Sequence, residues 1–141
     1  MKRTRLIAGP LALAIALSPL ASFGAKATKP EKPDHIAFGQ EVQIADYAVE
    51  GKTTVFDFTS KFCPPCVAIA PKLDKLHATR DDIAVVKVDI NRPDVRGIDW
   101  KSPVAQQYKL RSIPHFKIFG PDGKLKAEGD EASELVNGML E

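Results

Sequence analysis

Runs of apolar, β-branched and aromatic residues along the chain predict strands. Residues 53–59 and 83–88 are such runs, and both are typical of strands buried on two faces. Before them, Val42 and Ile44 alternate with polar neighbours, which predicts a short strand exposed on one face. The chain is therefore expected to build a sheet whose central strands are covered on both sides.

Helical spacing of apolar positions appears between and after these strands. One face of the first predicted helix, which begins within residues 63–66, carries Cys66, Ile69, Ala70, Leu73, Leu76 and His77. Pro71 lies inside this pattern and should kink the helix. Ser102 followed by Pro103 predicts a second helix, running to about Lys109. Asp130 can cap a last helix that carries Leu135, Val136, Met139 and Leu140.

A hairpin is expected near the end of the chain. Residues 115–119 and 124–127 read as strands, and the turn 121–123 (Pro-Asp-Gly) joins them. The strand–helix–strand segments before it require parallel crossovers, whereas the hairpin requires antiparallel pairing. The sequence thus predicts an α/β fold with a mixed central sheet and helices on both faces.

The first residues have the features of an export signal. Lys2, Arg3 and Arg5 precede a short apolar run, and small residues follow it. We expect residues 1–25 to be a secretory signal peptide, 26–36 a Lys- and Pro-rich linker, and 37–141 the folded domain. Export implies an oxidising compartment, and the expected location is the periplasm. An uncleaved membrane anchor is the alternative reading of the same segment.

Charge and cysteine content narrow the possible functions. Removing the three N-terminal cations changes the formal net charge from +2 to −1, so we expect no binding of nucleic acid or of an anionic membrane surface. The two cysteines, Cys63 and Cys66, are three residues apart, and a disulfide across so short a loop constrains the unfolded chain little. Thiol reactivity or metal binding is the better explanation of the pair.

The segment Cys63-Pro64-Pro65-Cys66 lies where a buried strand ends and a helix begins. A thiolate at a helix N-terminus is stabilised by free backbone N–H groups and by the helix dipole. Cys63, which lies further out, is the expected nucleophile, and Cys66 is the expected resolving thiol. Because proline has no N–H group, Cys63 should depend strongly on the amide of Cys66.

These residues and several others resemble the thioredoxin superfamily over roughly residues 53–129. Asp57 stands six residues before Cys63, and Pro71 five residues after Cys66. Lys87 lies in the next strand, and Ile113-Pro114 precedes the hairpin, where the family has a cis-proline. The resemblance implies a thioredoxin-like fold and a protein-disulfide oxidoreductase that needs no cofactor besides a redox-active Cys63–Cys66 disulfide.

The resemblance also implies roles for individual residues. Asp57 would accept the proton of Cys66, with a pKa raised by burial, and Lys87 would oppose that rise. Pro114 would be cis and lie against the disulfide, while Ile113 would offer its backbone to an extended substrate peptide. Phe62 and His115 would border the same substrate site, and a cationic His115 would lower the pKa of Cys63. An exposed histidine at the start of a strand is the alternative reading of His115.

The sequence departs from cytosolic thioredoxin at several positions. Phe62 and Thr59 replace two tryptophans, Pro64 replaces a glycine, and extra residues lie near 95–101. These changes resemble an exported branch that reduces periplasmic thiols. We expect a reductant, because the chain lacks room for the large helical insertion of the strongly oxidising periplasmic branch that the family includes. Trp100, in the longer segment, is a candidate for partner docking, although a tryptophan that covers a small core is the alternative.

Two functions are carried forward. The first is an oxidoreductase, expected to be a monomer, whose partners are protein thiols and disulfides and a membrane electron donor. The second is a metal carrier that uses Cys63, Cys66 and His115 for Cu(I) or Zn(II).

Overall fold

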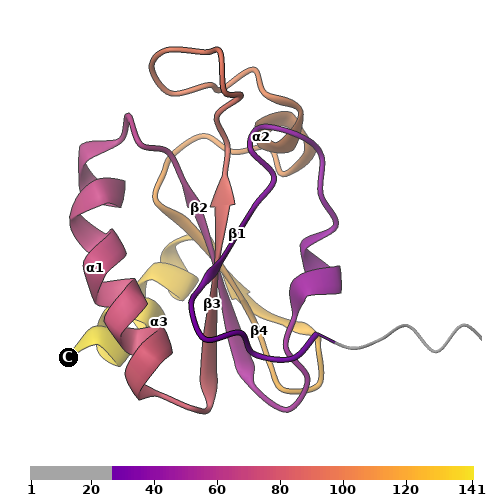
Figure 1. Ribbon diagram of the computed structural model, residues 1–141, viewed down its shortest axis with the longest axis vertical. Helices are drawn as coiled ribbons and strands as arrows, with labels where there is room; N and C mark the ends of the chain where they lie inside the picture. The colour runs from indigo at the N-terminus through magenta and orange to yellow at the C-terminus, as the bar shows by residue number, and fades with distance from the viewer. Residues whose placement is uncertain (1–26) are drawn as a thin grey trace, which may run out of the picture.

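A computed structural model of the protein describes residues 27–141, which fold around one sheet (Figure 1). Its strands are β1 (Asp34–Ile36), β2 (Thr53–Thr59), β3 (Ile83–Asp89), β4 (His115–Phe119) and β5 (Leu125–Glu128). The helices are the 3-10 turn η1 (Ile44–Tyr47), α1 (Pro64–Thr79), α2 (Pro103–Gln107) and α3 (Gly129–Leu140). None of the helices within these residues has the length and apolar character that a bilayer span requires.

The sheet has the strand order β1-β3-β2-β4-β5. β3 pairs in parallel with β1 on one side and with β2 on the other. β4 pairs antiparallel with β2, and β5 pairs antiparallel with β4. The predicted mixed sheet is therefore confirmed, and β2 lies at its centre with its carboxyl end leading directly into α1.

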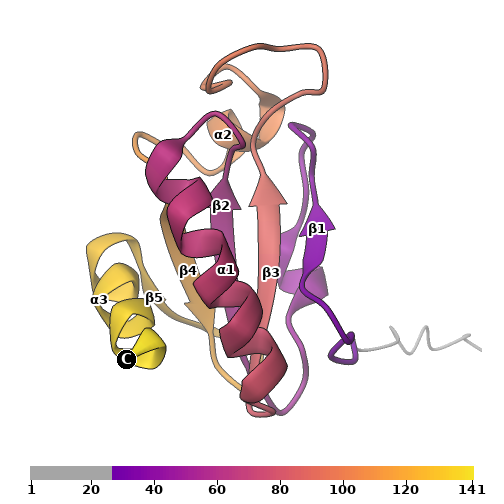
Figure 2. The same ribbon diagram turned by 60° about the vertical axis from the view of Figure 1, so that its left-hand side comes forward.

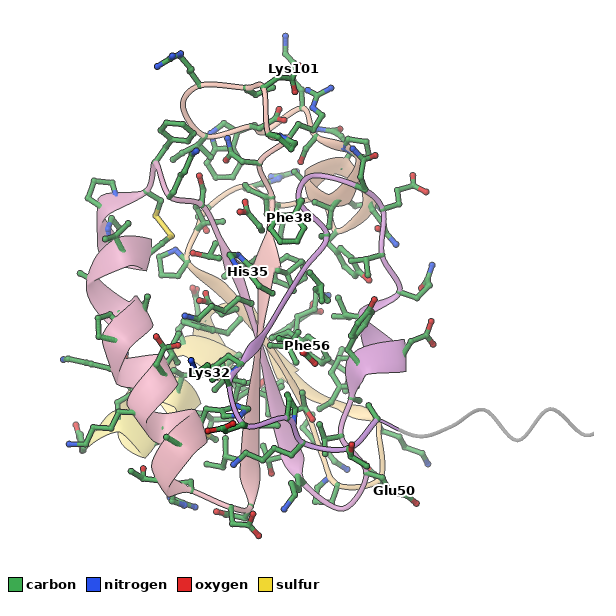
Figure 3. The ribbon with its side chains drawn as sticks, in the orientation of Figure 1. Lys32, His35, Phe38, Glu50, Phe56 and Lys101 are labelled. Atoms are coloured by element: carbon green, nitrogen blue, oxygen red, sulfur yellow. A yellow bond between two sulfur atoms is a disulfide. The ribbon has the colours of Figure 1, made fainter. Side chains whose placement is uncertain are left out.

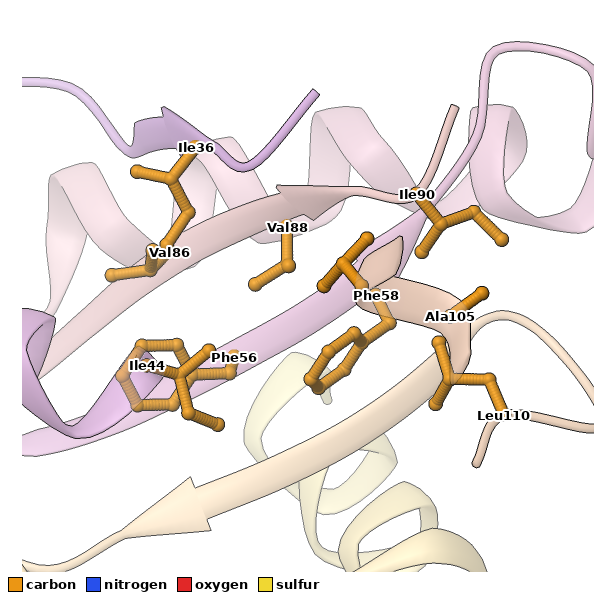
Figure 4. Packing of buried hydrophobic residues seen from close by; sticks show 10 residues of the cluster. Ile36, Ile44, Phe56, Phe58, Val86, Val88, Ile90, Ala105 and Leu110 are labelled. Atoms are coloured by element: carbon orange, nitrogen blue, oxygen red, sulfur yellow. The ribbon is translucent and has the colours of Figure 1, made fainter. Parts of the chain in front are cut away.

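Helices cover both faces of the sheet, as predicted (Figure 2). On one face, Val55 of β2 packs in a cluster with Leu73 of α1 and Val136 of α3. On the other face, Phe56 packs in a second cluster with Ile44 and Val104 (Figure 4). The alternation of neighbouring residues between two cores follows from the two-residue period of a strand.

The predicted linker 26–36 is wrong over most of its length, because the fold already includes these residues. β1 pairs with the edge of β3, and Ile36 is buried. Upstream of β1, the carbonyl of Pro30 accepts a 2.9 Å hydrogen bond from Nε2 of His77. Lys29 donates to the carbonyls of His77 and Arg80 at the end of α1, 2.7 Å each. The predicted signal peptide, 1–25, lies outside the described residues.

The strand predicted around Val42 and Ile44 is also absent from the described structure. Ile44 begins η1 and is buried in the core, whereas the backbone of Val42 is bound by side chains of the α2 segment. Gln107 bonds both the N–H and the C=O of Val42 at 3.0 Å, and the Tyr108 hydroxyl donates to the same C=O at 2.7 Å. Side chains thus satisfy groups that would otherwise seek a neighbouring strand.

The predicted helix starts are confirmed at α1 and α2 but not at α3. The Oγ of Ser102 accepts the N–H of Ala105 at 3.3 Å, and α2 ends at Gln107. α1 continues through Pro71. The last helix begins at Gly129, which has a φ of +64°, so Asp130 lies in its first turn rather than at its cap.

Candidate active site

Cys63 and Cys66 form a disulfide at the N-terminal end of α1 (Figure 3). Cys63 is the N-cap residue of the helix, and its Sγ accepts the N–H of Cys66 at 3.3 Å. Pro64 and Pro65, which occupy the first helical positions, have no N–H to offer. The structure therefore confirms that the Cys66 amide donates to the Cys63 sulfur, as the sequence predicted.

Both cysteines are nearly covered. Cys63 is 2% exposed to solvent and Cys66 is 0% exposed, so Cys63 is only slightly the more exposed residue of the two. The Sγ of Cys63 lies 3.7 Å from the carbonyl oxygen of Ile113, and the Ile113-Pro114 peptide bond is cis. The loop before β4 thus closes one side of the disulfide.

Asp57 is fully buried in the middle of β2. It lies on the same face of the sheet as Val55, toward α1, and both of its carboxylate oxygens lack a hydrogen-bond partner. Burial raises the pKa of Asp57 from 3.8 to about 7, because an ionised carboxylate is poorly solvated there. A carboxyl group with a pKa near neutrality is suited to proton transfer at physiological pH.

Lys87 is the register neighbour of Asp57 across the β2–β3 pair. Its Nζ does not bond Asp57 but forms an ion pair with Asp74 of α1, 2.5 Å between Nζ and Oδ1. The Lys87 charge lowers the pKa of Asp57 and the Asp74 charge raises it, both by less than burial raises it. Asp74 belongs to this electrostatic group, although the sequence analysis did not identify it.

A pocket of about 260 Å³ lies beside this group of charges. Its lining includes Cys66, Lys87 and Asp74, together with His35 and Asp89, whose side chains are 3.6 Å apart. The pocket lining includes Cys66 but neither Cys63 nor Ile113, so this space lies beside the inner cysteine.

The two residues predicted to border the substrate site, His115 and Phe62, have different surroundings. The ring of His115 packs edge-on against Phe58, 5.7 Å between centroids, on the α2 side of the sheet. Burial, followed by the charge of Lys117, lowers the pKa of His115, which favours the neutral ring over the predicted cation. Phe62 is half-buried next to Cys63, and its N–H is held by Ser60.

Ser60 and Asn91 form a buried hydrogen-bond network at the carboxyl ends of β2 and β3. The Oγ of Ser60 donates to Oδ1 of Asn91 at 2.6 Å and accepts the N–H of Phe62 at 3.2 Å. The carbonyl of Ser60 accepts the N–H of Cys63 at 3.1 Å. This network was not predicted from the sequence. The available signal was a polar residue directly after one buried strand, Ser60, and another two residues beyond the next, Asn91.

The longer segment near 95–101 folds back on Asn91. The Nδ2 of Asn91 donates to the carbonyls of Gly97, at 2.6 Å, and Val95, at 3.4 Å, and its Oδ1 accepts the N–H of Asp99. A two-pronged ion pair between Arg92 and the buried Asp99 closes the loop, 2.7 and 3.0 Å. The loop is therefore built from internal bonds, and Trp100 remains 36% exposed on it.

The donor set for a metal is incomplete. Among residues 27–141, no group of three or more His, Cys, Asp and Glu side chains is placed to hold an ion. The predicted third ligand, His115, packs on Phe58 instead.

Comparison with known proteins gives a consistent result. Thioredoxin F1 of Arabidopsis thaliana chloroplasts is 38% identical over 87 residues, 60% of this chain and 44% of that protein. Thioredoxin H3 of the same plant is 36% identical over 75 residues, 53% of this chain and 56% of its own length. The chain thus spans about half the length of these curated relatives.

Solved structures agree with the sequence relatives. The thioredoxin of Malassezia sympodialis superposes with a TM-score of 0.53 at 25% identity, covering 79% of this chain and 91% of that one. A structure described as a complex of ferredoxin:thioredoxin reductase and thioredoxin f2 matches with a TM-score of 0.52 at 25% identity, covering 77% and 93%. The thioredoxin family model matches residues 34–141, which begin with β1 and include the disulfide and every strand of the sheet, and the chain belongs to the thioredoxin family.

Proposed function

We propose that the protein is a thiol–disulfide oxidoreductase that acts on protein disulfides. The observation that carries the proposal is the Cys63–Cys66 disulfide at the N-terminal end of α1, with the Cys66 amide on the Cys63 sulfur. A helix N-terminus lowers the pKa of a thiol and so raises the fraction of reactive thiolate. Asp57, with a pKa of about 7, supplies a base on the same side of the sheet.

The reaction proceeds in two exchange steps. The Cys63 thiolate attacks one sulfur of a substrate disulfide, that S–S bond breaks, and the released substrate thiolate takes a proton from solvent. Cys66 then gives its proton to the Asp57 carboxylate and attacks the Cys63 sulfur of the mixed disulfide. The Cys63–Cys66 bond forms, the second substrate thiolate leaves, and two electrons have passed to the substrate.

We also propose that the protein works outside the cytosol as a reductant. The basic and apolar N-terminal residues support export, and the departures from cytosolic thioredoxin at Phe62, Thr59 and Pro64 support a separate branch. An exported reductant needs electrons from across the membrane, so a membrane protein is its proposed donor. A monomer is sufficient for this chemistry, because both cysteines lie on one chain.

The deciding experiment for direction is the reduction potential of the Cys63/Cys66 pair, measured by equilibration with glutathione or dithiothreitol. A value near about −270 mV supports a reductant, whereas a value near about −120 mV indicates an oxidant. If no intramolecular disulfide forms at any ratio of reduced to oxidised buffer, the redox function is wrong. Cell fractionation and the N-terminal mass of the recovered protein test export and cleavage separately.

A further inference from the structure

The segment 91–101 has no part in the exchange steps, yet it is bonded to the loop that carries Cys63. β2 and β3 run in parallel and end together at Thr59 and Asp89. The residues that follow, Ser60 and Asn91, continue the link between the strands through their side chains, 2.6 Å from Oγ to Oδ1. The longer segment and the dithiol loop are therefore connected where the sheet ends.

Only two hydrogen bonds separate Asn91 from Cys63. The first joins the side chains of Asn91 and Ser60, and the second joins the Ser60 carbonyl to the Cys63 N–H. Ser60 is 1% exposed and Asn91 is 5% exposed, so water does not readily replace these bonds. The position of the Cys63 backbone thus depends on the Asn91 side chain.

The rest of the segment fixes that side chain. Both atoms of the Asn91 amide have two protein partners: Oδ1 accepts from Ser60 and Asp99, and Nδ2 donates to Gly97 and Val95. Gly97 has a φ of +78°, a backbone conformation that favours glycine, and this turn aims its carbonyl at Asn91. The hydrogen bonds of the loop therefore hold the Asn91 side-chain amide in one orientation.

We infer that Ser60 and Asn91 are positioning residues for Cys63, and that the 91–101 segment exists to hold them in place. This inference rests on the proposed redox function. In the oxidised protein the disulfide itself fixes Cys63 over α1. In the dithiol form only non-covalent bonds keep the Cys63 sulfur at the Cys66 amide, where a hydrogen bond to a thiolate is stronger than one to a neutral sulfur.

The network therefore stabilises the reduced form more than the oxidised form. Removing it should shift the equilibrium toward the disulfide, so that the pair becomes more strongly reducing. It should also raise the pKa of the Cys63 thiol, because the thiolate is held less well at the helix N-terminus. A purely structural role would lower the stability of both redox forms equally and leave their equilibrium unchanged.

The test compares Ser60→Ala and Asn91→Ala with the unaltered full-length chain in glutathione buffers. Each variant is expected to shift the dithiol–disulfide equilibrium constant about fivefold toward the disulfide, or about 20 mV for a two-electron couple. The double variant should shift it no further than Asn91→Ala alone, because both residues act through one bond. Absorbance of the thiolate against pH should show the Cys63 pKa rising in parallel.

Ser102→Ala is the matched control. It removes the cap of α2 just beyond the same loop, where the Ser102 hydroxyl accepts the N–H of Ala105 and is no part of the Ser60–Asn91 bond, so its equilibrium constant should equal that of the unaltered chain. Ser60→Ala deletes one oxygen and leaves the bonds of Asn91 to the loop, so it stays informative if Asn91→Ala unfolds. An unchanged constant in folded Ser60→Ala overturns the inference. Failure of the unaltered chain to cycle at all refutes the redox function instead.

Discussion

Lys87 and Asp74 form an ion pair between β3 and α1, and this pair leaves the Asp57 carboxylate without a hydrogen-bond partner. Lys87 is the register neighbour of Asp57, yet its ammonium group is turned to Asp74. The arrangement keeps a positive charge near Asp57 without bonding it directly. The pKa of Asp57 is consequently set by burial first and by the two charges second.

The stability of the protein should fall as the pH rises through the pKa of Asp57. This pKa is about 7 in the folded protein, above the value of 3.8 for an exposed carboxyl, so the folded state binds more protons between these values. The difference corresponds to about 4 kcal/mol, fully lost above pH 8. Unfolding of the oxidised protein in urea at pH 4 to 8.5 measures it.

Asp57→Asn serves as the control for this pH dependence. Its uncharged side chain does not titrate, so the loss of stability between pH 4 and 8 should largely disappear. A constant difference between the two proteins at all pH values reflects packing alone. If the two curves run parallel over this range, the raised pKa of Asp57 is wrong.

Substitution of the two charges should move the pKa of Asp57 in opposite directions. Lys87→Met removes the charge that lowers this pKa, so the pKa should rise above about 7. Asp74→Asn removes the charge that raises it and frees Lys87, so the pKa should fall. The carboxyl carbon signal of Asp57, followed by NMR against pH in the oxidised protein, reports both changes.

Lys117→Met is a suitable comparison for these variants. Lys117 pairs with Glu128 at 2.6 Å between β4 and β5, and its side chain lies with Tyr108 on the other face of the sheet. The pKa of Asp57 should not change in this variant. An equal shift in Lys117→Met and Lys87→Met would show that net charge, and not the local pair, controls Asp57.

The two cysteines should behave differently when each is replaced. Cys63→Ser should abolish reduction of a protein disulfide such as that of insulin, because the attacking sulfur is gone. Cys66→Ser should still attack but should accumulate a covalent mixed disulfide, seen as a thiol-sensitive band after electrophoresis. Full activity of Cys63→Ser, or trapping by Cys63→Ser in place of Cys66→Ser, contradicts the assigned order of attack.

The segment before Ala37 should contribute strongly to stability. A chain that begins at Ala37 lacks β1, the buried Ile36 and the contacts of Lys29 and Pro30 with the end of α1. Loss of one buried aliphatic side chain and several hydrogen bonds should cost at least about 3 kcal/mol relative to a chain that begins at Ala27. Equal urea midpoints for the two chains would mean that the segment is dispensable.

The sequence predicted the central elements of this fold because they bury long apolar runs. β2 begins and ends where predicted, and so does β4. Both strands place buried side chains in the core along their length. The first helix was predicted from its apolar face. The spacing of Cys63 and Cys66 left thiol reactivity and metal binding open, and the disulfide was implied by the resemblance to thioredoxins.

The edge of the sheet could not be predicted in the same way. β1 has three residues and a single buried side chain, Ile36, so it carries no usable periodicity. Its place is fixed by backbone pairing with β3 and by the bonds of Lys29 and Pro30, just before it, to His77, which is distant in sequence. Val42 shows the converse. Its alternating pattern predicts a strand, but its backbone N–H and C=O are bonded by the side chains of Gln107 and Tyr108.

The candidate site was predicted as far as local motifs reach. Asp57, Lys87 and Pro114 were identified through the resemblance to thioredoxins, whereas Asp74 and Asn91 act across elements and leave no local pattern. The cationic His115 was expected from its place after Pro114. Strand register turns its ring toward Phe58 instead, because neighbouring residues in β4 face opposite sides of the sheet.

The bonds of Lys29 and Pro30 to the end of α1 also determine how the domain is oriented when it is attached through its N-terminal residues. Lys29 and Pro30 contact the C-terminal end of α1, whereas the Cys63–Cys66 disulfide lies at the N-terminal end of the same helix (Figure 3). Any attachment made through the preceding residues would leave the Cys63–Cys66 end of the domain facing away from the point of attachment. A bead, a fusion partner or a membrane fixed at that point leaves the reactive end open to incoming proteins.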